Sequence, residues 1–275
     1  MRKIAHIVHP VVVDPSSDLV VAQPITFETM RIACEFARSQ VDVQLFAIQY
    51  QDEERLPLPG CFTRLPDIIR SSRNLEAFKS DRKLALIKDI LNPLYNATDA
   101  DYLIYTNVDI AVLPYFYLTA AKIASQGYDG FIINRRTISN RYSQIEEIPA
   151  MFAEVGETHP GSDCFVFTRE NYEKFLLGNV VIGCEFIGLT LRTNLAVFSK
   201  KFEHFRDLHL TFHIGDDRVW LNQTAESLYN QKELDGIFQQ LLTDKNVTQP
   251  QELQWFYRHY QQRKHSVQER IKNQG

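Results

Sequence analysis

The chain has 275 residues, and 44% of them are hydrophobic, which is enough to bury the core of one large α/β domain. Its 30 basic and 34 acidic residues give a formal net charge of −4. Without an overall positive field, the chain is not expected to bind nucleic acid. The four cysteines show no CxxC spacing, which argues against the common zinc and redox patterns.

The N-terminus places basic residues ahead of an apolar stretch, but His6, His9 and Pro10 interrupt that stretch. It is better explained as a first strand than as a signal peptide. No run approaches the roughly 18 apolar residues that a membrane-spanning helix needs. We therefore expect a soluble, cytoplasmic protein without a transmembrane segment.

Hydrophobic periodicity predicts alternating strands and helices along the chain. The expected strands cover residues 4–13, 41–50, 102–106, 130–134 and 164–168, and the expected helices cover 26–38, 83–94, 115–126, 169–177 and 183–194. Residues 51–66 contain three prolines and are predicted as a long loop. The pattern is helical from residue 222 on, and it predicts an α/β fold with a mainly parallel central sheet flanked by helices.

The segment 251–274 holds more basic than acidic residues. Its basic residues are Arg258, Arg263, Lys264, Arg270 and Lys272, and its acidic residues are Glu252 and Glu269. One interpretation is peripheral contact with a membrane or an acidic partner. The other is a solvated amphipathic helix that packs Leu253, Trp255, Phe256 and Tyr260 onto the domain.

The buried strand 102–106 is followed directly by Asn107-Val108-Asp109. Two oxygen-bearing side chains in these positions suit a hard divalent cation. A bound Mn²⁺ or Mg²⁺ could neutralise the leaving diphosphate of a nucleotide sugar as a Lewis acid. Asn and Asp also end strands in ordinary turns, so the pair alone is a weak signal.

Apolar residues alternate with His209, Thr211 and His213 along segment 208–213, which places these three side chains on one face of an extended segment. Gly215 then allows the chain to turn. A neutral imidazole suits Mn²⁺ better than Mg²⁺ as a further ligand. The alternative is a hydrogen-bonded structural histidine.

Two carboxylates are candidates for catalysis. Asp163 follows a small-residue turn at the edge of a predicted strand, where it could act as general base for an acceptor hydroxyl or satisfy turn amides. Glu185 is the second candidate, with a helix first-turn position as the alternative. Positive charge for phosphate could come from Arg82 or Lys83, or from the Arg135-Arg136 pair, although a solvated surface charge is the ordinary role of each.

Taken together, these residues resemble the glycosyltransferases of the GT-A fold, the nucleotide-sugar-dependent class with an Asp-x-Asp signature. The resemblance spans roughly residues 1 to 220 and rests on the order and type of the residues. It implies that Asp109 and His213 hold the metal, with His209 as the fallback ligand. Asn107 replaces the first aspartate of the signature, which leaves metal dependence open.

The resemblance also implies a donor site. The loop after the first strand would contact the base and ribose, through His9, Pro10, Val11 and Asp14. Arg82 or Lys83 would contact the donor, and Asn107 could bind the ribose or the sugar. Asp163, or second Glu185, would be the base of an inverting enzyme.

We therefore predict a GT-A-like catalytic domain over residues 1–222, with a helical extension over 223–275 packed on it. The predicted activity is metal-dependent transfer of a sugar from a nucleoside-diphosphate sugar to a glycan, lipid or protein acceptor. One alternative is an inactive GT-A-like scaffold, which Asn107 favours. A sugar-phosphate nucleotidyltransferase is the other, but residues 1–59 lack the glycine that its phosphate loop would need.

Overall fold

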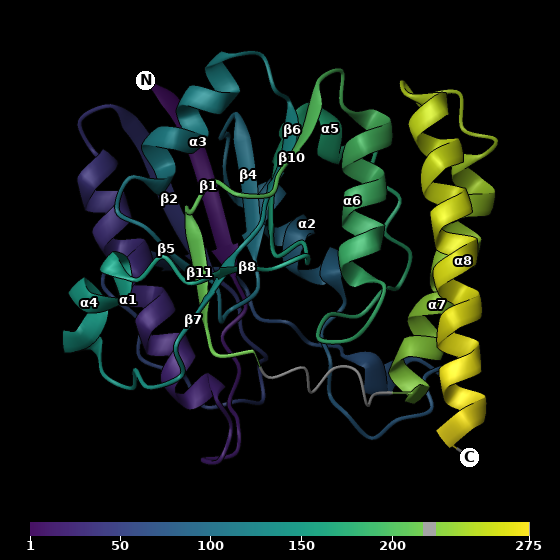
Figure 1. Cartoon of the computed structure of the whole chain (residues 1–275), viewed down its shortest axis with the longest axis horizontal. Coiled ribbons are helices and arrows are strands. Elements are labelled where there is room, and N and C mark those ends of the chain that lie inside the picture. Colours follow the sequence, from purple (N-terminus) through teal and green to yellow (C-terminus); the bar gives the residue numbers. More distant parts are fainter. Residues whose placement is uncertain (217–223, 275) are drawn as a thin grey trace.

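A seven-stranded sheet forms the centre of the computed structural model, which describes residues 1–216 and 224–274 (Figure 1). The strand order is β10-β6-β9-β4-β1-β2-β3. These strands are β1 (Arg2–Val8), β2 (Val41–Ala47), β3 (Phe62–Arg64), β4 (Tyr102–Thr106), β6 (Gly130–Ile133), β9 (Cys164–Thr168) and β10 (Phe202–Phe205). All neighbours pair in parallel except β9, which runs antiparallel to both β4 and β6. The predicted mainly parallel sheet is confirmed.

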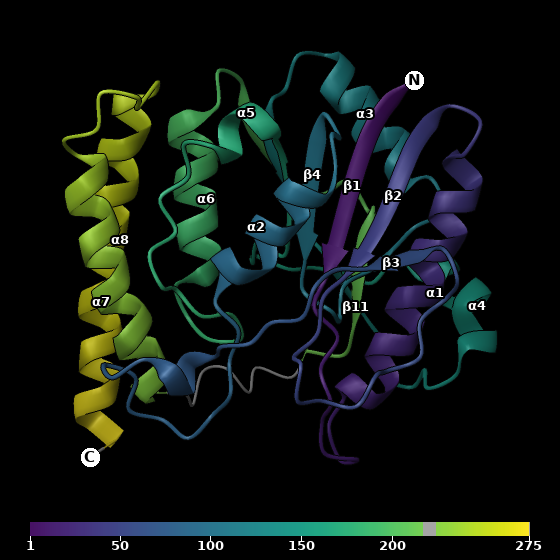
Figure 2. The ribbon, with the colours of Figure 1, turned by 180° about the vertical axis from the view of Figure 1, so that it is seen from behind.

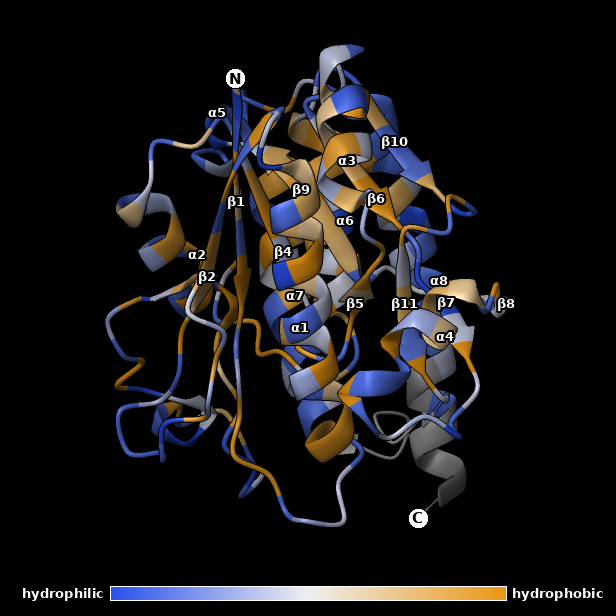
Figure 3. Cartoon of the chain, turned by 90° about the vertical axis from the view of Figure 1, so that its left-hand side faces the viewer, coloured by the Kyte–Doolittle hydropathy of each residue, from blue (hydrophilic) through white to orange (hydrophobic). Residues whose placement is uncertain are grey.

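Helices cover both faces of this sheet, because alternate residues along each strand point to opposite sides. Ile4 and Val8 of β1 pack with α1 (Leu19–Ala37) and α3 (Phe116–Ser125). Ala5 and Ile7 pack in the core that contains α2 (Ile87–Ala97) and α6 (Ile187–Phe198). Figure 3 shows the strands of the centre as largely hydrophobic between these layers.

A second, smaller sheet was not predicted. It has the order β5-β11-β7-β8, and its strands are β5 (Ala111–Val112), β7 (Arg136–Ile138), β8 (Glu157–Thr158) and β11 (Thr211–Ile214). β11 overlaps the extended segment predicted over 208–213, but β5, β7 and β8 have two or three residues each, too few for periodicity to reveal. β5 and β7 continue the chain beyond β4 and β6, so the small sheet lies at the carboxyl ends of those strands. The short helices α4 (Ile148–Ala153) and α5 (Arg169–Tyr172) and two 3₁₀ turns (Ser72–Asn74 and Ile145–Glu147) complete the main body.

The C-terminal helices α7 (Thr224–Leu241) and α8 (Pro250–Gln274) lie side by side beyond α6 (Figures 1 and 2). Leu253, Phe256 and Tyr260 are buried, and the Tyr260 hydroxyl donates to Asp235 Oδ1 at 2.8 Å. Trp255 remains 45% exposed, so three of the four side chains that were expected to pack are buried. The side chains of Arg270 and Lys272, and the proposed domain boundary at residue 222, fall outside the described residues.

Several element boundaries differ from the prediction. The first strand ends at Val8, before a proline that cannot donate to a sheet, and the first helix begins seven residues earlier than expected, at Leu19. The helix predicted from residue 83 begins at Ile87. It continues through Pro93 to Ala97. The helix predicted over 183–194 covers Ile187–Phe198, so Glu185 precedes it.

No helix in the described parts of the chain is long and apolar enough to cross a membrane.

His6 gives the fold a pH dependence. It is fully buried, with its ring nitrogens 2.9 Å from the Tyr117 hydroxyl and 2.9 Å from Thr106 Oγ1, and burial lowers its pKa from 6.5 to about 3. Below pH 6.5 the imidazole of His6 is protonated in the unfolded chain but stays neutral in the folded chain. The free energy of unfolding therefore decreases as the pH falls.

We predict that, between pH 6 and pH 5, the free energy of unfolding of His6→Gln decreases by about 1 kcal/mol less than that of the wild type. Urea denaturation at both pH values measures it. His265→Gln, at an exposed histidine on α8, should keep the wild-type dependence. An unchanged dependence in His6→Gln would contradict the assignment.

Candidate functional site

The antiparallel strand β9 brings three loops together. Its first residue, Cys164, pairs with Thr106 at the end of β4 and with Ile133 at the end of β6. Asp163, just before β9, is therefore adjacent to the loops that follow β4 and β6. Those loops carry Asp109 and Arg135.

Asp109 and His213 meet at this edge, with Asp109 Oδ2 3.3 Å from His213 Nε2. Two contacts position them: Ile110 N–H donates to Asn107 O at 3.2 Å and closes the turn after β4, and β11 pairs antiparallel with β5. His213 Nδ1 lies 2.7 Å from Gly215 O, so Nδ1 carries the hydrogen. The hydrogen bond and charge of Asp109 raise the pKa of His213 against the effect of burial, so the protonated ring donates from Nε2 to this carboxylate. When the ring is neutral, the Nε2 lone pair faces the carboxylate instead.

A cation fits between these two acceptors. Asp109 Oδ1 is buried and has no hydrogen-bond partner. A neutral imidazole with its other nitrogen bonded to a carbonyl is the usual form of a metal-ligating histidine. Among the described residues, no three His, Cys, Asp or Glu side chains converge on one point. A metal here would complete its coordination with substrate phosphates and water, as Mg²⁺ commonly does.

Asp163 belongs to a charged group on the other side of β9. Arg135 Nη1 lies 3.6 Å from Asp163 Oδ1, and Arg135 Nη2 lies 3.6 Å from Asp216 Oδ1. His159 lies 3.8 Å from each of the same carboxylates. Asp163 and Arg135 are buried, and Asp163 Oδ2 has no hydrogen-bond partner. This oxygen can accept a proton.

Their surroundings shift the pKa values of Asp109 and Asp163 in opposite directions. Burial raises the pKa of the Asp163 carboxyl, and the nearby Arg135 guanidinium only partly offsets the rise. Burial also acts on Asp109, but the hydrogen bond and charge of the protonated His213 ring outweigh it and hold the pKa of Asp109 below its usual value. Asp109 is thus the better cation ligand and Asp163 the better proton acceptor, a division typical of paired catalytic carboxylates.

The expected donor residues His9 and Lys83 lie together at the ends of β1 and β2. His9 Nδ1 is 2.8 Å from Ile48 O, and His9 Nε2 is buried without a partner. Tyr50 connects the pair: its ring is 5.2 Å from the His9 ring, and Lys83 Nζ is 3.9 Å from its centroid. Lys83 also pairs with Glu53 at 3.1 Å. Burial lowers the pKa of His9, so its ring is neutral.

The loop after β1 is held in place by other contacts. The backbone N–H and C=O of Val11 bind the side-chain amide of Gln23, at 2.9 and 3.0 Å. Pro10 is buried. Asp14 is exposed and accepts from Ser16 N at 2.9 Å, which forms a local turn. The Asp14 carboxylate therefore stabilises a turn within its own loop.

Arg82 and Glu185 lie toward the C-terminal helices. Arg82 Nη1 is 3.8 Å from Glu226 Oε1 on α7. Glu185 is buried beside Arg263 of α8, 3.5 Å away. The expectation that Arg82 and Lys83 open a helix, and that Glu185 lies in a first turn, is wrong because both helices begin later.

Three further predicted residues have different surroundings. The Tyr105 hydroxyl donates to Asn107 Oδ1 at 3.2 Å, which orients the amide. His209 has a positive φ of 45°. Burial and the charge of Arg136 lower its pKa. Arg136 pairs with Asp207 and donates to Gly156 O at 2.8 Å, so it supports the small sheet.

Sequence reasoning missed the role of His159 and the pairing of Arg135 with Asp163. The sequence predicts Arg135 only as a charge for phosphate or as a solvated surface charge. The available signal for His159 was its place at the start of the His-Pro-Gly-Ser-Asp turn, four residues before Asp163. Nothing in the sequence links that turn to Asp216.

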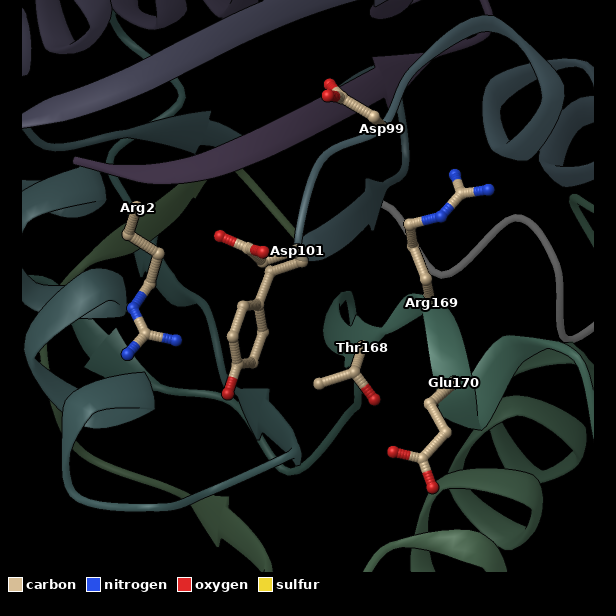
Figure 4. Close-up of a pocket in the computed structure, with 7 residues that line it drawn as sticks. Arg2, Asp99, Asp101, Thr168, Arg169 and Glu170 are labelled. Carbon is tan, nitrogen blue, oxygen red and sulfur yellow. The ribbon is translucent and has the colours of Figure 1, made fainter.

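A pocket of about 660 Å³ lies at the opposite edge of the large sheet. Arg2 and Arg169 lie on either side of Asp101 in this pocket (Figure 4). Arg169 already donates to Tyr95 O at 2.7 Å and Thr98 O at 2.6 Å. None of the predicted site residues lines it, so it is separate from the Asp109 and Asp163 group.

No protein-family profile and no curated protein sequence matches the chain. Solved structures match it in fold. The crystal structure of Staphylococcus aureus TarS residues 1–349 has a TM-score of 0.53 with 8% identity, over 91% of this chain and 68% of that one. Its complex with UDP-GlcNAc gives 0.52 with 9% identity, over 93% and 71%. The fold is that of the GT-A glycosyltransferases. A Pyrobaculum calidifontis mannosyltransferase in complex with GDP-Man and Mn²⁺ aligns at 0.49 with 12% identity, over 90% and 66%.

We predict that Arg135→Gln lowers the free energy of unfolding by about 3 kcal/mol at pH 7, because it leaves Asp163 buried without its cation. The loss should be smaller at pH 5, since Asp163 can then take up a proton. Urea denaturation at the two pH values tests this. Arg38→Gln, at an exposed arginine, is the control and should change little. Equal losses at both pH values would argue against the pairing.

Proposed function

We propose that the chain is a glycosyltransferase that uses a nucleoside-diphosphate sugar and a divalent metal. The observation that carries the proposal is the Asp109 and His213 pair, in which an imidazole nitrogen and a carboxylate oxygen lie 3.3 Å apart at the carboxyl end of β4. Ligand sites of open α/β sheets occur at this edge. The GT-A fold supports this reading.

Asp109 and His213 would hold the metal, Mn²⁺ or Mg²⁺, which would supply Lewis-acid neutralisation of the departing diphosphate. His9 and Lys83, with Pro10 and Val11 in the same loop, would line the nucleotide side. Asn107, oriented by Tyr105, would bind the ribose or the donor sugar.

Asp163 would act on the acceptor. Its raised pKa and unpartnered Oδ2 suit a general base that removes a proton from an acceptor hydroxyl. Glu185 and Asp163 each pair with an arginine, but Glu185 faces Arg263 of α8 while Asp163 lies near Asp109, so Glu185 ranks second as a base. Arg82 ranks behind Lys83 on the donor side, because Lys83 shares the Tyr50 ring with His9 whereas Arg82 faces Glu226 of α7.

Calorimetric titration of the full chain with UDP, GDP, CMP and their sugar conjugates, each with Mn²⁺ and with chelator, tests the donor site. We expect one nucleotide to bind in a metal-dependent way, and Asp109→Ala and His213→Ala each to weaken it about 100-fold, which corresponds to about 3 kcal/mol.

Asp99→Ala and His265→Ala are matched controls at exposed positions and should bind like the wild type. If no nucleotide binds with or without metal, the transferase proposal fails and an inactive GT-A-like scaffold takes its place. Binding without any metal effect would remove the metal from the proposal.

The second test separates catalysis from binding. Asp163→Asn should lower the rate at which nucleotide is released from the bound donor by about 10²- to 10⁴-fold, the range expected for loss of a general base. The affinity for the donor should stay within about threefold of the wild-type value. Asp99→Asn serves as its control. Wild-type turnover in Asp163→Asn would exclude this aspartate as the base.

A further inference from the structure

A group of basic and aromatic side chains lies where α6, β10 and α8 meet. We define the Arg192 cluster as Arg192 on α6, His204 on β10, Arg206 just after β10, and Trp255 and His259 on α8. The Arg192 guanidinium carbon lies 5.7 Å from the Trp255 ring centroid. The Trp255 and His259 rings stack at 5.3 Å. Figure 1 shows α6 between β10 and α8.

The positive charge of the Arg192 cluster is not balanced. Within residues 1–216 and 224–274, neither Arg192 nor Arg206 forms an ion pair, and Arg192 Nε is buried without a hydrogen-bond partner. Burial lowers the pKa of Arg192, the charge of Arg206 lowers it further, and Glu252 is the carboxylate that acts in the other direction. Arg263, beside His259, is already paired with Glu185.

A partly buried guanidinium without a carboxylate costs free energy. Contact with Trp255 and with Phe256, at 5.1 Å, offsets part of that cost through cation–π attraction. Within the described part of the chain, no hydrogen bond uses the donors of Arg192 or Arg206. A guanidinium presents them in a planar fork that matches a phosphate or carboxylate.

The Arg192 cluster is connected to Asp163. His204 Nε2 is hydrogen-bonded to Asn134 Oδ1, and Asn134 Nδ2 donates to His159 O at 2.7 Å. α6 itself begins against the loop of Asp163, since a Cβ atom on Gly188 would lie 3.5 Å from Ser162 O. A molecule bound at the cluster would therefore lie on the acceptor side of the site.

We propose that the Arg192 cluster binds an anionic group of a carbohydrate acceptor, a phosphate, sulfate or carboxylate carried on a sugar. The inference rests on the proposed function, because it assigns the cluster to the acceptor of that reaction. The partly exposed indole of Trp255 beside the Arg192 guanidinium gives an apolar surface next to the anion site, a combination that suits a charged sugar. A membrane surface would require a wider apolar face.

The test is binding of the full chain to an array of immobilised neutral, carboxylated, sulfated and phosphorylated glycans. We expect at least about tenfold preference for an anionic class over the neutral one, weakened by added salt. Combined Arg192→Gln and Arg206→Gln should lose that preference, and Trp255→Ala should reduce it. The charge-matched control combines Arg38→Gln, just after α1, with Lys122→Gln on α3, and it should keep the preference.

Equal binding of neutral and anionic glycans, or unchanged binding by the double variant, would overturn the inference. So would stronger binding to vesicles containing phosphatidylserine or to a polyglutamate peptide. If the double variant does not fold, the exposed Arg206→Gln alone replaces it and should still weaken binding several-fold.

Nucleotide titration of the same variants separates the two proposals. Wild-type nucleotide binding together with lost glycan binding supports both. Nucleotide binding with glycan binding insensitive to the Arg192 cluster removes only the acceptor inference. Anionic-glycan binding in a chain that binds no nucleotide removes the transferase proposal and the acceptor role with it.

Discussion

The site depends on the antiparallel insertion of β9 between β4 and β6. Six of the seven strands of the large sheet run in one direction, and β9 alone is reversed. Its amino-terminal end therefore lies at the carboxyl ends of its neighbours, where Thr106 and Ile133 both pair with Cys164. A parallel β9 would have placed Asp163 at the opposite edge, far from Asp109. The register of one five-residue strand thus fixes which carboxylates share the site.

The small sheet adds the second half of this arrangement. β5 and β7 follow β4 and β6 in the chain, and β11 pairs with both from a segment about 80 to 100 residues later. This pairing places His213 against Asp109, and it allows Gly215 to fix the hydrogen of the imidazole on Nδ1. The result is a carboxylate and an imidazole arranged for a cation on one side of β9. On the other side, Arg135 and His159 surround a carboxylate whose pKa is raised.

Sequence patterns predicted the boundaries of the strands that consist of one uninterrupted apolar run. The strands Tyr102–Thr106 and Cys164–Thr168 have the predicted boundaries, because each is an uninterrupted apolar or β-branched run. The start of α2 was placed too early, since Lys83 and Leu84 continue the apolar spacing of the helix. In the folded chain Leu84 N–H donates to Ser72 Oγ instead, and Lys83 turns to Tyr50 and Glu53. Contacts between distant segments override helix periodicity there.

The sequence by itself determined the α/β class, the order of the main strands and helices, and the residue types Asp109, Asp163 and His213 at the ends of strands. These follow from periodicity of side chains along a single segment. Only the tertiary structure decided that Asp109 meets His213, that Arg135 pairs with Asp163 rather than remaining free, and that Glu185 and Arg82 turn toward α8 and α7. The same is true of Arg192 and Arg206, which form no ion pair with any described residue and lie around α6. The reason is that each of these contacts joins residues far apart in the chain, and their register depends on the packing of the whole sheet.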